Sequence, residues 1–275
     1  MNLLHLLREI EKVEDNEVIR PDSRRKALRQ FGQFTRNAVL AALPFAVGSA
    51  SAQSTNVTVV DGVLQFALTF KYLEADFYSL AVASPGLIPA GVDLDAINTI
   101  VGHENQHVNF LKTAIEFLGK TPGPKPTFDF SGGKGIGPGP FADVFSNYET
   151  FLTLAQALED TGVRALKGQA PQLLGEGAIL TQILSIHSIE ARHASHIRQM
   201  RQRRGAALKP WITGKVSGID SAFQPAYDGE ESESQGGITI KQISGLPISA
   251  EAASESFDEP LTKEQALIII DPFLV

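Results

Sequence analysis

Four segments of this 275-residue chain repeat apolar residues at steps of three and four, which is the period of a helix buried along one side. The segments cover residues 58–82, 94–118, 142–166 and 173–200. Near the middle of each apolar stripe stands a glutamate: Glu74, Glu104, Glu159 or Glu190. The four segments predict an all-α four-helix bundle that turns four carboxylates toward its own core.

The stretches between these segments predict how the helices connect. Short stretches that contain Pro and Gly join the first helix to the second and the third to the fourth, around residues 85–91 and 168–171. The middle connection, residues 119–140, is long, rich in Gly and Pro, and has no helical period. Because short loops join antiparallel neighbours and long ones cross a bundle, we expect two helical hairpins and a crossover within residues 53–205.

Both predicted hairpins carry the same polar pattern. A single glutamate on the first helix is followed by Glu-x-x-His on the second, so that His107 accompanies Glu104 and His193 accompanies Glu190. Glu74 precedes Glu104 by 30 residues, and Glu159 precedes Glu190 by 31. Since residues three apart lie on one face of a helix, each Glu-x-x-His pair can turn both side chains toward the same point.

Buried carboxylates have to be neutralised by protons, by Lys or Arg, or by bound cations. We find no Lys or Arg at the central stripe positions, and the chain contains no cysteine. Two divalent cations would balance four carboxylates while both histidines stay neutral. We therefore predict a two-metal centre with six ligands, in which Glu104 and Glu190 bridge the ions, His107 and His193 each cap one, and Glu74 and Glu159 fill terminal positions.

This set and order of ligands resembles the ferritin-like di-iron and di-manganese carboxylate proteins. More narrowly, the chain is similar to exported bacterial ferritin-like domain proteins that are related to plant desiccation-associated proteins. The resemblance covers residues 58–200 and implies a ferritin-like four-helix bundle that binds two divalent metal ions, with iron as the first expectation and manganese as the alternative. It also implies small oxidants as partners.

Three functions are compatible with such a centre. The first is the oxidation of ferrous iron or the activation of oxygen or peroxide by a di-iron protein. The second is peroxide disproportionation of the manganese-catalase type. The third is a non-catalytic protein of desiccation or envelope stress that keeps the metal for stability. Whether the chain is an enzyme, and whether it forms a homo-oligomer, stays open at this point.

Several further polar residues lie near the predicted ligands in the sequence. Tyr78, one helical turn after Glu74, is a candidate for a redox-active or hydrogen-bonding tyrosine, with core packing as the plainer alternative. His187 is expected to be a partly buried structural histidine, the alternatives being a hydrogen-bond partner of the ligands or an alternative ligand. His103 and His196 are expected to face solvent or neighbouring helices, and Asp160 to point away from the metals.

The N-terminus has the order of a secretory signal: a basic region, a short apolar run over residues 38–48, and the small residues Ala50-Ser51-Ala52. The basic Ser23-Arg24-Arg25-Lys26-Ala27-Leu28-Arg29 resembles a twin-arginine signal, with Ala27 where Phe is usual. We expect residues 1–52 to direct export to the periplasm, the alternative being an amphipathic helix over residues 2–18. The apolar run is too short for a permanent membrane anchor.

Residues 206–275 are predicted to form a C-terminal extension. It is partly irregular, with a short strand over Ile238–Ile243 and a helix that begins at the capping box Thr262–Gln265. The apolar end of that helix should pack on the bundle or on a partner. The net charge of −7 argues against nucleic acid as that partner, since such binding needs clustered Lys and Arg.

Overall fold

The computed structural model describes residues 50–219, 221–245 and 247–275, so most of the predicted export signal lies outside the described residues. Four long helices form the predicted bundle: α3 (Ala50–Ala83), α4 (Val92–Phe117), α5 (Tyr148–Gln169) and α6 (Gly177–Arg203). The all-α four-helix bundle is thereby confirmed. In the part of the chain that the structure describes, no helix is both long enough and apolar enough to cross a bilayer.

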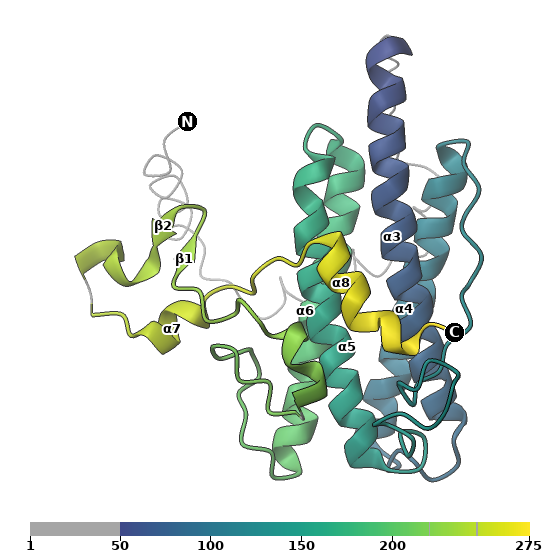
Figure 1. Ribbon diagram of the computed structural model, residues 1–275, viewed down its shortest axis with the longest axis vertical. Coiled ribbons are helices and arrows are strands. Elements are labelled where there is room, and N and C mark those ends of the chain that lie inside the picture. The colour runs from purple at the N-terminus through teal and green to yellow at the C-terminus, as the bar shows by residue number, and fades with distance from the viewer. Residues whose placement is uncertain (1–49, 220, 246) are drawn as a thin grey trace, which may run out of the picture. The chain divides into compact units, whose positions relative to one another are not determined.

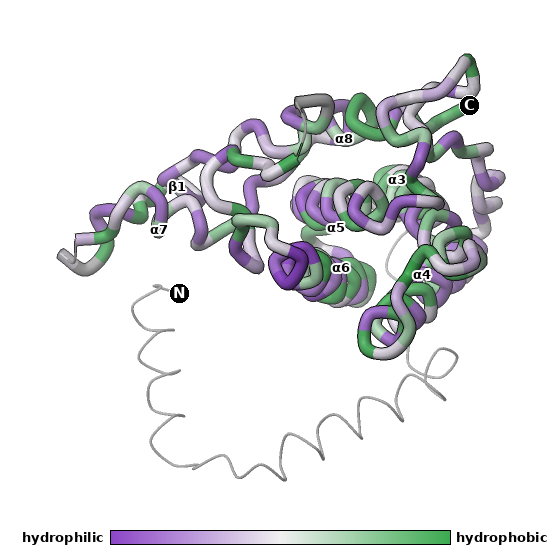
Figure 2. The backbone as a smooth tube through the Cα atoms, turned by 90° about the horizontal axis from the view of Figure 1, so that it is seen from below, coloured by the Kyte–Doolittle hydropathy of each residue, from purple (hydrophilic) through white to green (hydrophobic). Residues whose placement is uncertain are grey.

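The helices pair as the loop lengths predict. Helix α3 packs along α4 and helix α5 along α6, and the long segment from Leu118 to Asn147 crosses from one hairpin to the other. Figures 1 and 2 show the two hairpins side by side, and Figure 2 views them from one end of the bundle. This arrangement brings the midpoints of all four helices together.

Two helices begin later than their apolar stripes suggested. Helix α5 was expected from residue 142 but begins at Tyr148, because extended Asn147 caps it by accepting hydrogen bonds from the backbone N–H groups of Glu149 and Thr150. Helix α6 was expected from residue 173 but begins at Gly177, because the 3₁₀ turn η1 (Ala170–Leu173), with a proline in its first turn, intervenes. The apolar residues before both starts pack in turns, so periodicity alone misplaced the ends.

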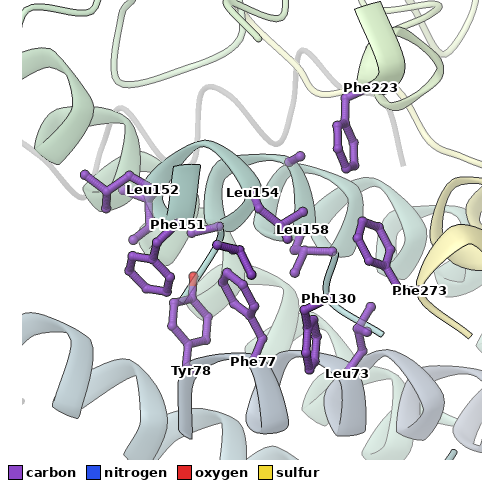
Figure 3. Packing of buried hydrophobic residues seen from close by; sticks show 14 of the residues in the cluster. Leu73, Phe77, Tyr78, Phe130, Phe151, Leu152, Leu154, Leu158, Phe223 and Phe273 are labelled. Atoms are coloured by element: carbon purple, nitrogen blue, oxygen red, sulfur yellow. The ribbon is translucent and has the colours of Figure 1, made fainter. Parts of the chain in front are cut away.

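The apolar core is divided along the bundle axis. On α4, Ile97 and Ile100 belong to one cluster and Leu111 and Ile115 to another; Glu104 and His107 lie between them. Helix α6 repeats this division around Glu190 and His193, with Ile183 and Ile186 on one side and Ile197 and Met200 on the other. Figure 3 shows part of the larger cluster, where Leu73, Phe77 and Tyr78 of α3 face Phe151 and Leu158 of α5. A polar layer is thus enclosed by apolar side chains at both ends.

The C-terminal extension packs on the bundle rather than standing apart from it. Its elements are η2 (Ser221–Ala226), β1 (Ser234–Gln235), β2 (Ile238–Thr239), η3 (Ile240–Gly245), α7 (Ala250–Ser254), α8 (Lys263–Ile270) and η4 (Asp271–Phe273). The capping box that begins α8 is formed as predicted, and α8 lies beside α5 (Figure 1). The strand expected over Ile238–Ile243 is only two residues long, because the chain turns into η3 directly after its short antiparallel pairing with β1.

Candidate metal centre

All six predicted ligands meet in the polar layer between the two apolar clusters. The four glutamates have no exposed surface, and the two histidines are 5% exposed. Three groups of side chains offer three ligand atoms within 4.8 Å of one another: Glu104, Glu159 and His193; Glu104, His107 and Glu190; and Glu74, Glu159 and Glu190. The helical register of the sequence therefore brought together every residue that it singled out as a ligand.

The two imidazoles lie against the same edge of this cluster. His107 Nδ1 is 3.2 Å from Glu190 Oε1 and 3.4 Å from Glu104 Oε1. His193 Nδ1 is 3.1 Å from Glu104 Oε1 and 3.5 Å from Glu159 Oε2. Metal–ligand bonds of about 2.0–2.2 Å place neighbouring ligand atoms roughly 3.0–3.5 Å apart, so these separations suit a common ion.

These ligand atoms are also left without hydrogen bonds. Within the described part of the chain, no hydrogen-bond partner is found for five buried atoms on this edge: Glu104 Oε1, His107 Nδ1, Glu159 Oε2, Glu190 Oε1 and His193 Nδ1. Buried polar atoms without partners are costly, and five in one place require an explanation. A bound cation would supply it, because each of these atoms has a lone pair to offer when both imidazoles are neutral. The donor set of nitrogen and carboxylate oxygen suits iron or manganese.

The structure overturns one premise of the sequence analysis, namely that no Lys or Arg occupies a central stripe position. Lys71 is completely buried on α3, one turn before Glu74. Its ammonium contacts Glu74 and Glu190 and lies 3.2 Å from Glu104 Oε2. The predicted apolar stripe of this helix passed through Phe70. A second line of residues with the same helical spacing was missed, and all of its members are buried: Val60, Leu64, Ala67, Lys71, Glu74 and Tyr78.

Burial and charge act against each other on the ionisable groups of the centre. Burial alone would lower the pKa of Lys71, but Glu104, Glu190 and Glu74 raise it well above its ordinary 10.5. Burial raises the pKa of Glu74 well above 4.5. Burial would do the same for Glu104, but Lys71 and the histidines hold the pKa of Glu104 well below its ordinary value. Glu104 is therefore ionised at neutral pH and available to a cation.

Tyr78 contacts the centre directly. Its hydroxyl donates a 2.7 Å hydrogen bond to Glu159 Oε1, and the ring packs against Phe77 and Phe151. Burial and the charge of Glu159 raise the pKa of Tyr78 well above 10.0, so the phenol keeps its proton. Tyr78 therefore both donates a hydrogen bond to a predicted ligand and packs in the core.

His103 supports one of the ligand histidines. Its Nδ1 lies 2.9 Å from Nε2 of His193, and the two rings are stacked. Because one nitrogen of His193 is thereby occupied, the other is directed toward the carboxylates. The expectation that His103 faces a neighbouring helix is met, but its contact with a ligand was not foreseen. His187 behaves as a structural histidine, with Nδ1 3.1 Å from the carbonyl of Val163.

Gly162 of α5 is a further residue that the sequence analysis missed. A Cβ atom at this position would lie 2.7 Å from Glu74 Oε1, so glycine leaves the room that the carboxylate occupies. The signal was available, since Gly162 follows Glu159 by three residues and shares its face. Asp160 points away from the centre as expected, and its carboxylate binds Arg198 and accepts a 2.7 Å hydrogen bond from Tyr227.

Comparison with known proteins agrees with this geometry. A family model described as a ferritin-like domain matches residues 60–203, more than half of the chain, and that range contains all six predicted ligands. No curated protein matches the chain.

Proposed function

Because this chain belongs to the ferritin-like domain family, we propose that it binds iron at the buried centre and uses it to oxidise ferrous ions or to activate oxygen or peroxide. Manganese is the alternative metal. The observation that carries the proposal is the group of five buried ligand atoms on the histidine edge, all without hydrogen-bond partners in the described residues. The ligands are Glu104, His107, Glu159, Glu190 and His193, with Glu74 as the sixth predicted member.

The metal, when bound, supplies redox and Lewis-acid chemistry. The chain's own residues prepare the site for it. Apolar side chains at both ends exclude bulk water, which strengthens every charge interaction inside. His103 fixes the ring orientation of His193, and Tyr78 holds a proton 2.7 Å from Glu159 Oε1. Tyr78 thus holds the Glu159 carboxylate in position beside the centre.

Metal analysis of the purified protein, followed by two activity assays, tests this proposal. We expect bound iron, with oxygen consumption when ferrous ions are added. Bound manganese with rapid peroxide decay would favour the peroxide-disproportionating alternative instead. Tight metal binding without turnover would favour the non-catalytic stress protein.

A matched pair of variants ties the metal to this site. Replacing both ligand histidines, His107→Ala with His193→Ala, should remove the metal. Replacing His187→Ala, which lies on the same helix as His193 and contacts a backbone carbonyl, should leave it. If the double variant retains its metal, the proposed site is wrong.

We also propose export through the twin-arginine route, on the sequence of the N-terminus alone. The order of basic, apolar and small residues supports it. Cell fractionation of the full chain should find the protein in the periplasm, and Arg24→Lys with Arg25→Lys should retain it in the cytoplasm. Periplasmic location that is unaffected by this double replacement would exclude the twin-arginine route.

A further inference from the structure

The two carboxylates predicted to bridge a pair of metal ions divide their oxygens between two different neighbours. Glu104 turns Oε1 toward His193 and His107, at 3.1 and 3.4 Å, and Oε2 toward Lys71 Nζ, at 3.2 Å. Glu190 turns Oε1 toward His107, at 3.2 Å, and Oε2 into contact with Lys71. Both therefore bridge a histidine edge and a lysine edge.

On the lysine edge the ammonium is fully surrounded. Its Nζ donates hydrogen bonds to Glu74 and Glu190 and forms an ion pair with Glu104 Oε2 at 3.2 Å. All four side chains have no exposed surface. A second metal ion that used the same oxygens would occupy the position of Nζ, and the buried lysine would have to leave.

On the histidine edge, by contrast, no Lys or Arg from the described residues contacts the ligand atoms. Five atoms from five residues are without hydrogen bonds there. They comprise two imidazole nitrogens and three carboxylate oxygens, which are donors that a first-row metal ion accepts. Two groups of three among these residues have ligand atoms within 4.8 Å of one another: Glu104, His107 and Glu190, and Glu104, Glu159 and His193. The two edges therefore differ in kind: one holds a fixed cation of the chain, and the other offers unused lone pairs.

We propose that Lys71 stands in for one of the two metal ions, so that the centre binds a single ion on the histidine edge. The ligands of that ion are drawn from Glu104, Glu159, Glu190, His107 and His193, and Glu74 serves as the counter-ion of Lys71. This inference rests on the proposed metal binding and changes its stoichiometry, because the two-ion prediction assumed that no lysine was present.

The number of ions per chain tests this directly. The full-length protein is stripped of metal, titrated with Mn²⁺ under anaerobic conditions, desalted, and analysed for manganese and protein. We expect one ion per chain and the electron paramagnetic resonance signal of an isolated Mn²⁺. Two ions per chain, or the signal of a coupled pair, overturns the inference while the proposed metal binding stands. If no ion binds, and iron gives the same result, the proposed function fails as well.

Variants separate the role of each edge. Lys71→Ala should raise the stoichiometry from one ion to two, while Lys125→Ala, which removes an exposed lysine paired with Asp76, should leave it at one. Glu74→Gln should also leave one ion bound, because the remaining five ligands are intact. Loss of the ion in Glu74→Gln contradicts the assignment of Glu74, and this result is informative even where Lys71→Ala fails to fold.

Discussion

A single hydroxyl group connects the apolar core to the metal ligands. The Tyr78 hydroxyl is completely buried and donates to Glu159 Oε1. Tyr78→Phe removes this donor and leaves the carboxylate with less compensation. We expect a loss of about 1–3 kcal/mol in the free energy of unfolding of the metal-free protein, measured by urea denaturation. Metal affinity should fall roughly tenfold, measured by titration.

Tyr72→Phe is the matched control for that prediction. Tyr72 lies on the same helix, is half-buried, and its hydroxyl reaches only the Gly123 carbonyl at 3.4 Å. The control should change neither stability nor metal affinity measurably. Equal effects of the two replacements would show that the bond to Glu159 contributes nothing particular.

The ligands should also make the stability of the metal-free protein depend on pH. Burial raises the pKa of Glu159 to about 7. Burial alone would lower the pKa of His193, but Glu159 and the other carboxylates raise it to about 11. Each group holds its proton in the folded state at a pH where the unfolded chain has lost it, above about 4.5 for Glu159 and 6.5 for His193. Their stabilising contribution is therefore complete below those values and is lost as the pH rises through 7 and toward 11.

Urea midpoints of the metal-free protein at pH 6, 7.5 and 9 provide the measurement, and they should decrease in that order. The lowered pKa of Glu104 does not disturb this window, since Glu104 is ionised throughout it in both states. Saturation with metal should reverse the trend, because metal binding displaces protons from the ligands. A midpoint that rises with pH in the metal-free protein would contradict the raised pKa values.

At the scale of single residues, the sequence predicted which six side chains meet but not what else meets them. Glu-x-x-His is visible because its spacing places two ligand types on one helical face. Lys71 escaped notice because a lysine in an apolar stripe is ordinarily placed at the margin, where its ammonium reaches water. Only the packing of α3 against the other helices shows that Nζ points inward.

Among the elements, α5 is the most closely packed, because the bundle lies on one side of it and the C-terminal extension on the other. Gly168 near its end shows how closely the chains approach: a Cβ atom there would lie 1.9 Å from the carbonyl oxygen of Leu261. The Leu261 N–H also donates a 3.1 Å hydrogen bond to the carbonyl of Arg164. Glycine is thus required for the extension to pair with this helix.

We predict that Gly168→Ala lowers the free energy of unfolding by about 1–3 kcal/mol, because the extension must shift. Gly102→Ala on α4 is the control, since a Cβ atom there meets nothing within 4 Å. The control should be stabilising by about 0.5–1 kcal/mol, as alanine favours a helix over glycine. Thermal and urea denaturation measure both, and a neutral Gly168→Ala would show that the extension does not pair closely with α5 in solution.

The helices themselves were predictable in number, order and pairing, because a period of 3.6 residues persists over many turns. Their ends were less so. Asn147 begins α5 through local capping hydrogen bonds, and the 3₁₀ turn η1 before Gly177 makes α6 begin later. The spacing of apolar residues indicates neither feature. The length of strand β2 was overestimated, because the apolar residues of Ile238–Ile243 suit a strand and a 3₁₀ turn equally.

In the molecule as a whole, the described residues form one compact unit, and the C-terminal extension belongs to it. Arg164 of α5 is almost completely buried and binds the extension through Glu230 at 2.7 Å and through the carbonyl oxygens of Asp228 and Glu259 at 2.8 Å. The sequence could not predict this attachment, because the residues that meet are far apart in the chain. The C-terminal extension is thus attached along the side of α5 (Figure 1).

This attachment predicts that a residue of the C-terminal extension stabilises the whole bundle. Phe273 is 1% exposed and packs between Phe141 of the crossover and Phe223 of η2. Phe273→Ala should lower the free energy of unfolding by about 3–5 kcal/mol, as for other aromatic residues in a core. Ile268→Ala, which removes a side chain that is 68% exposed on the same segment, should change it by less than about 0.5 kcal/mol. Urea denaturation followed by circular dichroism compares the two variants. The helices of the bundle dominate that signal. A single cooperative transition that Phe273→Ala shifts therefore means that the extension and the bundle unfold together. If Phe273→Ala left the main transition unchanged, the extension would be an independent attachment.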